Sequence, residues 1–188
     1  MTAIAALWLP ILVSAVLVFV ASSIIHMTPL WHRNDYPALP DQDRVQDALR
    51  PFNIRPGEYM LPRAKSMKDC NEPAFVEKLT RGPVLVMTVI PNGPMRMSRP
   101  LVQWFIYTVV ASGLVAYVAG HALPTDATYL QVFRVAGCTA FIAYAAGLWQ
   151  QSIWYSRPWS TTLKLTLDGL IYGLLSGGAF GWLWSSAG

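Results

Sequence analysis

Ionisable residues inside apolar segments are the first candidates for chemistry in this chain, because a charge in hydrocarbon is costly and usually has a function. Asp168 and Arg134 are two such residues, and they lie in different apolar segments at similar depths from opposite ends. Asp168 fits a proton or cation site. It equally fits a pair with Lys164, one helical turn earlier, or a hydrogen bond to Gln150 or Gln151.

Arg134 also has two interpretations. Its side chain could extend outward to lipid headgroups or to Asp126, or it could anchor an anionic ligand near His121. We expect Arg134 and Asp168 not to meet, because antiparallel helices place them near different leaflets. Asp168, Arg134 and His121 are therefore the candidate residues for an ion or ligand site.

Three histidines raise the question of a metal or haem. His26 and His32 lie on one face of the predicted bundle and His121 lies on the other, so the three cannot share an ion within one chain, and a bis-histidine haem is not expected. Residues on the first face include soft ligands suited to copper(I): His26, Met27, His32, Met95, Met97 and Cys70. Their spacing matches no metal motif, and the alternative is interfacial histidines and packing methionines. We therefore assign no metal ligands, and the cofactor stays unknown, with none predicted.

Catalytic signatures are missing from the sequence. It contains no nucleophile elbow, no HExxH helix and no phosphate-cradling glycine loop. Cys70 and Cys138 are the only cysteines and have no CxxC spacing. An enzyme would have to assemble its site from scattered residues, so a membrane-embedded enzyme is a less favoured alternative.

The composition places these residues in a membrane protein. Of 188 residues, 54% are hydrophobic and only 13% are charged, whereas charged residues approach about a quarter of an ordinary soluble domain. Four stretches of about 20 residues could each cross a bilayer: residues 3–25, 100–120, 128–150 and 163–184. No Lys or Arg precedes the first stretch, which favours a retained anchor over a signal peptide.

The basic residues predict the orientation of these four spans. Of 14 Lys and Arg residues, all but Arg134 lie on or beside the face that carries residues 26–99 and the loop at 151–162. The positive-inside rule makes that face cytoplasmic and both termini extracytoplasmic. We therefore expect a multi-pass protein of a bacterial cytoplasmic (inner) membrane.

Small residues recur every four positions in the predicted spans, which lets helix backbones approach closely. The last span has a ridge that resembles a glycine zipper, and the second span has a similar one. The helix-packing residues are Gly169, Gly173, Gly177, Gly181, Ser112, Ala116 and Gly120. We favour packing within the chain, and contact with another subunit is the alternative.

The segment between the first two spans has the helix-capping and turn residues typical of a small folded domain. We expect helices over residues 42–50 and 72–81 and strands over 58–61 and 84–90, the second strand buried on both faces. The sequence thus predicts an all-α membrane protein, a four-transmembrane-helix bundle with a small α+β cytoplasmic domain inserted between helices 1 and 2. Its parts are residues 1–26, 27–98 and 99–188.

Four runs, SSIIHM, PGEYMLP, LVQWFIY and SIWYSRPWSTTLK, together resemble a group of uncharacterised bacterial inner-membrane proteins. The resemblance implies the compartment and no activity. Our functional prediction is a non-enzymatic membrane component, either a homo-oligomer or an accessory subunit of a larger complex. Its expected partners are membrane lipids and itself or another membrane protein, with no nucleic acid. The alternative is a small oligomeric channel or transporter for a cation or proton.

Overall fold

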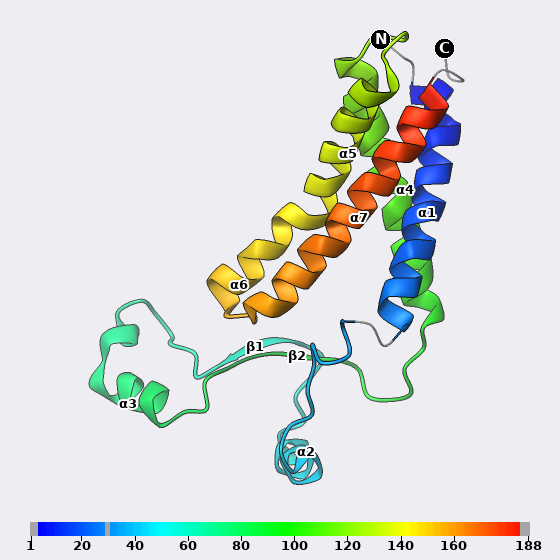
Figure 1. Ribbon diagram of the computed structural model, residues 1–188. Helices are drawn as coiled ribbons and strands as arrows, with labels where there is room; N and C mark the ends of the chain where they lie inside the picture. The colour runs from blue at the N-terminus through cyan, green and yellow to red at the C-terminus, as the bar shows by residue number, and fades with distance from the viewer. Residues whose placement is uncertain (1–3, 29–30, 185–188) are drawn as a thin grey trace. The chain divides into compact units, whose positions relative to one another are not determined.

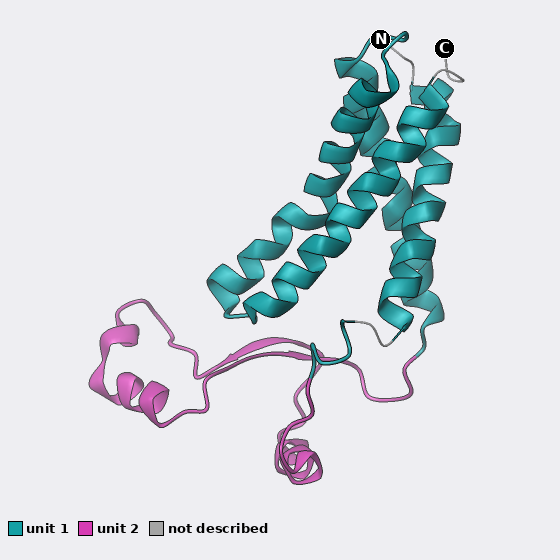
Figure 2. Ribbon diagram, in the orientation of Figure 1, with its two compact units in different colours: residues 1–36, 96–188 teal, residues 37–95 magenta. Residues whose placement is uncertain are grey.

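The computed structural model describes residues 4–28 and 31–184 of the chain. It divides the chain into two compact units, which Figure 2 shows in different colours. Unit 1 comprises residues 1–36 and 96–188, and unit 2 comprises residues 37–95. The chain is mostly helical, and its one described sheet has two strands.

Unit 1 is a helical bundle (Figure 1). Its helices are α1 (Trp8–Met27, after a 3-10 turn at Ile4–Leu7), α4 (Ser98–Ala122), α5 (Tyr129–Ala145), α6 (Trp149–Tyr155) and α7 (Trp159–Leu183). The main neighbours are α5 with α7, α1 with α4, and α1 with α7. Figure 1 shows that α7 diverges from α1 toward the end of the bundle where α6 lies.

Within the described residues, three helices are long and apolar enough to cross a membrane. They are Ile4–Met27, Ser98–Ala122 and Tyr129–Tyr155, and they correspond to the first three predicted spans. Helix α7 is as long as α4, with 25 residues, but its first half carries Lys164, Asp168 and several threonines. Its composition therefore does not place it with the other three.

The third predicted span is not one regular helix. Helix α5 begins with a capping box between Thr128 and Gln131 and ends at Ala145, where a 3-10 turn at Ala146–Leu148 leads into α6. The chain then turns at Ser156, whose φ is 54°, and enters α7. This turn sets α6 and the start of α7 side by side, linked by a 2.6 Å hydrogen bond between the hydroxyls of Ser152 and Thr162.

The glycine ridge of α7 lies against α5 of the same chain. A Cβ added at Gly177 would come within 2.7 Å of the Phe133 carbonyl oxygen, and one added at Gly173 within 2.9 Å of the Gly137 carbonyl oxygen. These distances leave no room for a side chain. Glycine at these positions therefore lets the two backbones approach, which is the intrachain arrangement favoured above.

Helices α1, α4 and α7 meet through buried serines and small residues. The hydroxyl of Ser14 donates to Ser176 at 2.9 Å and accepts from Ser112 at 3.2 Å, so one chain of hydrogen bonds joins the three helices. An apolar cluster is buried at the end of the bundle that contains Leu7 and Trp184. Its residues are Leu7, Val115, Ala116, Ala119, Val132, Ala136, Ala140, Phe180 and Trp184. Gly120 is also buried in α4.

Unit 2 is thin. It contains α2 (Gln42–Leu49), β1 (Gly57–Leu61), α3 (Pro73–Arg81) and β2 (Leu85–Val89), together with short 3-10 turns. The strands pair antiparallel, with Gly57 opposite Val89 and Leu61 opposite Leu85. Residues 37–95 are all described and none is buried, so the predicted burial of the second strand on both faces is wrong. Two strands without a packed layer cannot cover each other's faces.

Candidate functional site

A polar cluster forms where the segment after α1 meets the first half of α7. His32 is its centre. Its Nδ1 lies 2.7 Å from Oδ2 of Asp35, and its Nε2 lies 2.8 Å from Oδ2 of Asp168. The side chains of Asp35 and Asp168 are 6% and 2% exposed, so both carboxylates are shielded from solvent.

Lys164 ties the same segment to α7 one turn before Asp168. Its ammonium donates to the carbonyl of Trp31 and, at 2.7 Å, to Oδ1 of Asp35. Burial alone would raise the pKa of Asp35, but hydrogen bonds from Lys164 and His32 and their electrostatic attraction outweigh it and hold that pKa below its ordinary value. Asp35 is therefore a carboxylate at neutral pH and accepts from both neighbours.

The protonation of His32 follows from these partners. Because Asp35 is an acceptor, the His32 Nδ1 carries a proton and donates it. The indole Nε1 of Trp31, which can only donate, lies 2.9 Å from His32 Nε2, so that nitrogen presents a lone pair. The same Nε2 faces Asp168 at 2.8 Å. His32 Nε2 therefore lies within hydrogen-bond distance of both an indole donor and a carboxylate oxygen.

His26 lies beside this pair. Its ring stacks on that of His32 with centroids 4.6 Å apart and planes 9° from parallel. Its Nδ1 is 3.0 Å from the carbonyl of Ser22 one turn back, which is an acceptor, so Nδ1 donates and Nε2 carries the free lone pair. One potential ligand atom from each of His26, His32 and Asp168 lies within 4.8 Å of the others.

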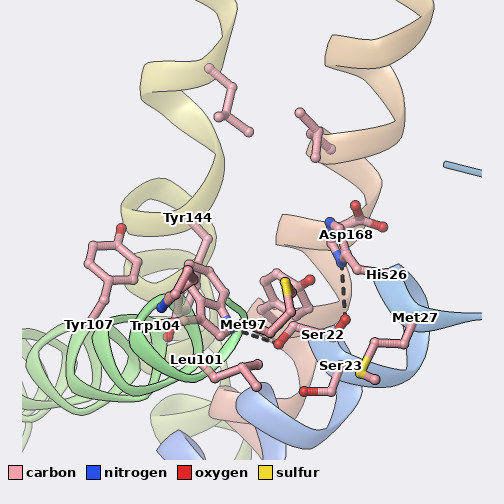
Figure 3. Close-up of a pocket in the computed structure, with 14 residues that line it drawn as sticks. Ser22, Ser23, His26, Met27, Met97, Leu101, Trp104, Tyr107, Tyr144 and Asp168 are labelled. Carbon is pink, nitrogen blue, oxygen red and sulfur yellow. Dashed lines mark hydrogen bonds between the residues drawn. The ribbon is translucent and has the colours of Figure 1, made fainter. Parts of the chain in front are cut away.

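A cavity of about 490 Å³ adjoins the cluster. Four helices contribute to it: the end of α1, the start of α4, the end of α5 and the first half of α7. Figure 3 shows His26 and Asp168 at one side of this pocket and Trp104, Tyr107 and Tyr144 at the other. The remaining lining is mainly apolar and includes Leu101, Leu165 and Met97.

Hydrogen bonds and ring contacts fix the aromatic side of the pocket. The indole of Trp104 donates to the Ser22 hydroxyl at 2.7 Å, and the hydroxyl of Tyr107 donates to the Ala143 carbonyl at 3.0 Å. Trp104 also contacts the rings of Tyr107 and Tyr144, at centroid distances of 5.3 and 6.3 Å. This wall therefore joins α1, α4 and α5.

Three buried polar atoms at the pocket have no partner among the described residues. They are the hydroxyls of Tyr144 and Tyr172 and Oδ1 of Asp168. All three residues line the pocket, and Asp168 and Tyr172 are 1% and 4% exposed. Buried polar groups are nearly always hydrogen-bonded, so two hydroxyls and one carboxylate oxygen are available to water or to a ligand.

The chain matches no protein-family model, no curated protein and no solved structure. The site is therefore interpreted from its own residues and distances.

The predicted site residues do not come together. Asp168 pairs with His32, not with Lys164 or the two glutamines, because Lys164 is engaged by Asp35. Arg134 is exposed on α5 and makes no salt bridge in the described part of the chain. His121 is exposed, and its Nδ1 bonds to the Tyr117 carbonyl.

Sequence reasoning missed the residues that surround Asp168. His26 and His32 are six positions apart across the end of a helix, and Asp168 is 136 positions from His32, so no local spacing links them. One signal was present: all three fall within about two helical turns of the same predicted membrane boundary. The pocket that His26 lines is at the beginning of α4, whereas His121 is at the end of that helix. This agrees with the prediction that His121 cannot join the other two histidines.

Proposed function

We propose that this protein is a four-span component of a bacterial cytoplasmic membrane that binds a lipid-soluble amphiphile in the pocket of unit 1. The ligand class is an apolar tail with a hydroxyl-bearing head group. Binding of this kind needs no reaction, so the proposal keeps the non-enzymatic role that the sequence predicts.

The fourth span in this proposal is α7. At about 1.5 Å per residue, its 25 residues give about 37 Å, enough for a bilayer of about 30 Å. Its two charged residues both have partners: Lys164 pairs with Asp35, and Asp168 lies within hydrogen-bond distance of His32. Such pairing lowers the free-energy cost of placing the start of α7 at the membrane boundary.

The proposed orientation follows from the basic residues. It places residues 27–98, and with them the pocket end of the bundle, at the cytoplasmic side, and both termini on the other side. The pocket then lies at the cytoplasmic leaflet, where a membrane amphiphile can reach it.

One observation carries the ligand proposal: the pocket combines apolar walls with three unpartnered polar atoms. An apolar tail matches the leucine and methionine side chains. Hydroxyls in the head group can accept from both Tyr144 and Tyr172 and donate to Oδ1 of Asp168, which removes all three deficits. The volume of about 490 Å³ is within the usual range for ligand pockets.

We also propose that contacts with another membrane protein or a second copy use surfaces other than the glycine ridge, because α5 already covers that ridge. The exposed residues of unit 2 and the outer face of α4 remain for such contacts.

Trp104 provides the test, because it lines the pocket. A monoacylglycerol with a brominated acyl chain should quench the fluorescence of Trp104 in the purified protein in nanodiscs, in a saturable way. A Trp104→Phe variant identifies the part of the quenching that belongs to this residue. Brominated diacyl phosphatidylcholine measures non-specific quenching of the exposed tryptophans.

The Tyr144→Phe, Tyr172→Phe double variant removes two hydroxyls and keeps both rings. With about 1 kcal/mol for each hydrogen bond, we expect it to weaken binding about 10- to 30-fold. The matched control is Tyr117→Phe, on an exposed part of α4, which should bind like the wild type. Equal affinity of the double variant and the wild type, or quenching that does not saturate, would overturn the proposal.

A further inference from the structure

The geometry points to a metal site formed by His26, His32 and Asp168, which binds a divalent first-row transition-metal ion. The site lies at the polar end of the pocket. The inference shares Asp168 with the amphiphile proposal but rests on the two histidines and not on the tyrosine hydroxyls, so the two can be tested separately.

The orientation of both imidazoles favours metal binding. A histidine that ligates a metal usually donates its other ring N–H to a carbonyl or carboxylate, which fixes the tautomer and the ring position. His26 donates from Nδ1 to the Ser22 carbonyl, and His32 donates from Nδ1 to Asp35. Each ring therefore presents the lone pair of Nε2 toward the same place.

The distances suit one ion. With metal–ligand distances of about 2.0–2.2 Å, ligand atoms next to each other around one ion lie about 3–3.5 Å apart. His32 Nε2 and Asp168 Oδ2 are already 2.8 Å apart, and no pair in the trio exceeds 4.8 Å. The most distant pair has to approach by roughly 1 Å. Rotation of the exposed His26 side chain can supply that movement.

The charge balance points the same way. A lone pair on His32 Nε2 and the carboxylate of Asp168 repel each other, and a metal ion between them would remove that repulsion. The indole of Trp31, which donates to the same lone pair and is itself exposed, would turn to solvent.

The donor set indicates the class of metal. Two imidazole nitrogens and one carboxylate are found in zinc and non-haem iron(II) sites that keep open positions for water or substrate. Mg²⁺ and Ca²⁺ prefer oxygen ligands and should bind poorly. Because His26 and Asp168 also line the pocket, the open positions would face its interior.

The experiment is a titration of the full-length protein, purified in mild detergent without chelator, with Co²⁺. Visible absorption reports the ligand field, and calorimetry reports the stoichiometry. We expect one Co²⁺ per chain, displacement by equimolar Zn²⁺ and no displacement by a hundredfold excess of Mg²⁺.

The decisive variant is His26→Ala, because this side chain is exposed and its loss should leave the fold intact. We expect affinity for Co²⁺ to fall at least 100-fold. The matched control is His121→Ala, also exposed and near the other end of the bundle, which should bind like the wild type. Asp35→Asn keeps all three ligands and removes the negative charge that His32 Nδ1 faces, and should weaken binding about 10- to 100-fold.

The two proposals fail separately. Tyr144→Phe with Tyr172→Phe should bind Co²⁺ normally even though it loses the amphiphile. Absence of a one-to-one Co²⁺ complex, wild-type affinity in His26→Ala, or competition by Mg²⁺ would each overturn the metal site.

Discussion

Substitution of Gly177 by alanine tests the close contact between α5 and α7. An added Cβ would lie 2.7 Å from the Phe133 carbonyl oxygen and 3.2 Å from Cα of Gly137. Both obstacles are backbone atoms, which cannot rotate away. The two helices must therefore separate by a few tenths of an ångström, and such overpacking typically destabilises a protein by about 1–3 kcal/mol.

Gly178→Ala is the matched control for this variant. It makes the same chemical change one position later in the same helix, but its Cβ would meet only the Tyr129 hydroxyl, at 4.0 Å. Its free energy of unfolding should stay unchanged or rise by up to about 1 kcal/mol, since alanine favours a helix over glycine.

The assay is equilibrium unfolding in mixed micelles, together with the subunit number of each variant from native mass spectrometry. We expect Gly177→Ala to be the less stable variant and both variants to keep the wild-type subunit number. Equal stability of the two, or a changed subunit number in Gly177→Ala alone, would refute the intrachain contact.

Three further expectations concern other parts of the chain. Ser14→Ala breaks both hydrogen bonds of the serine chain and should cost about 0.6–2 kcal/mol of unfolding free energy, more than Ser176→Ala, which breaks one; the same micelle assay compares them. Asp35→Asn should lower stability by about 1–3 kcal/mol at neutral pH. Because the pKa of Asp35 is lowered in the folded state, its stabilisation is fully present above the unfolded value of 3.8 and is lost as pH falls through the lowered value. Lowering the pH from about 7 to about 3 should therefore reduce the melting temperature of the wild type more than that of Asp35→Asn. Equal decreases in the two melting temperatures would contradict this. Finally, Cys70 should resist a membrane-impermeant maleimide in intact cells and react after lysis, as a cytoplasmic position requires, and labelling in intact cells would reverse the orientation.

The long elements could be predicted because their signals are local. Hydropathy located the three apolar helices to within a few residues, and the period of four in α7 pointed to a close helix contact. The break between α5 and α6 was missed because residues 146–148 are as apolar as their neighbours, and only backbone geometry distinguishes them.

In unit 2 the helices and strands were located, but their burial was not. The run at residues 84–90 is rich in β-branched residues, which is typical of a covered strand. The structure pairs it only with β1, and residues 37–95 include no element that covers the sheet. Burial depends on what else packs nearby, which local sequence does not report.

The site was found only in part for the same reason. Asp168 was identified from its cost in an apolar segment, and Lys164 was one of the partners considered for it. The structure gives each residue a different partner, His32 and Asp35, from a segment about 130 positions earlier. The tautomers of His26 and His32, on which the chemistry depends, can be inferred only once Ser22 and Asp35 are placed.

Native mass spectrometry of the gently extracted protein tests most directly whether the pocket of unit 1 is a ligand site. We expect the wild type to retain one amphiphile with a hydroxyl-bearing head group per chain. The Tyr144→Phe, Tyr172→Phe variant should lose it, and Tyr117→Phe should keep it. A bare polypeptide mass for the wild type, or equal retention by all three proteins, would contradict a binding role for this pocket.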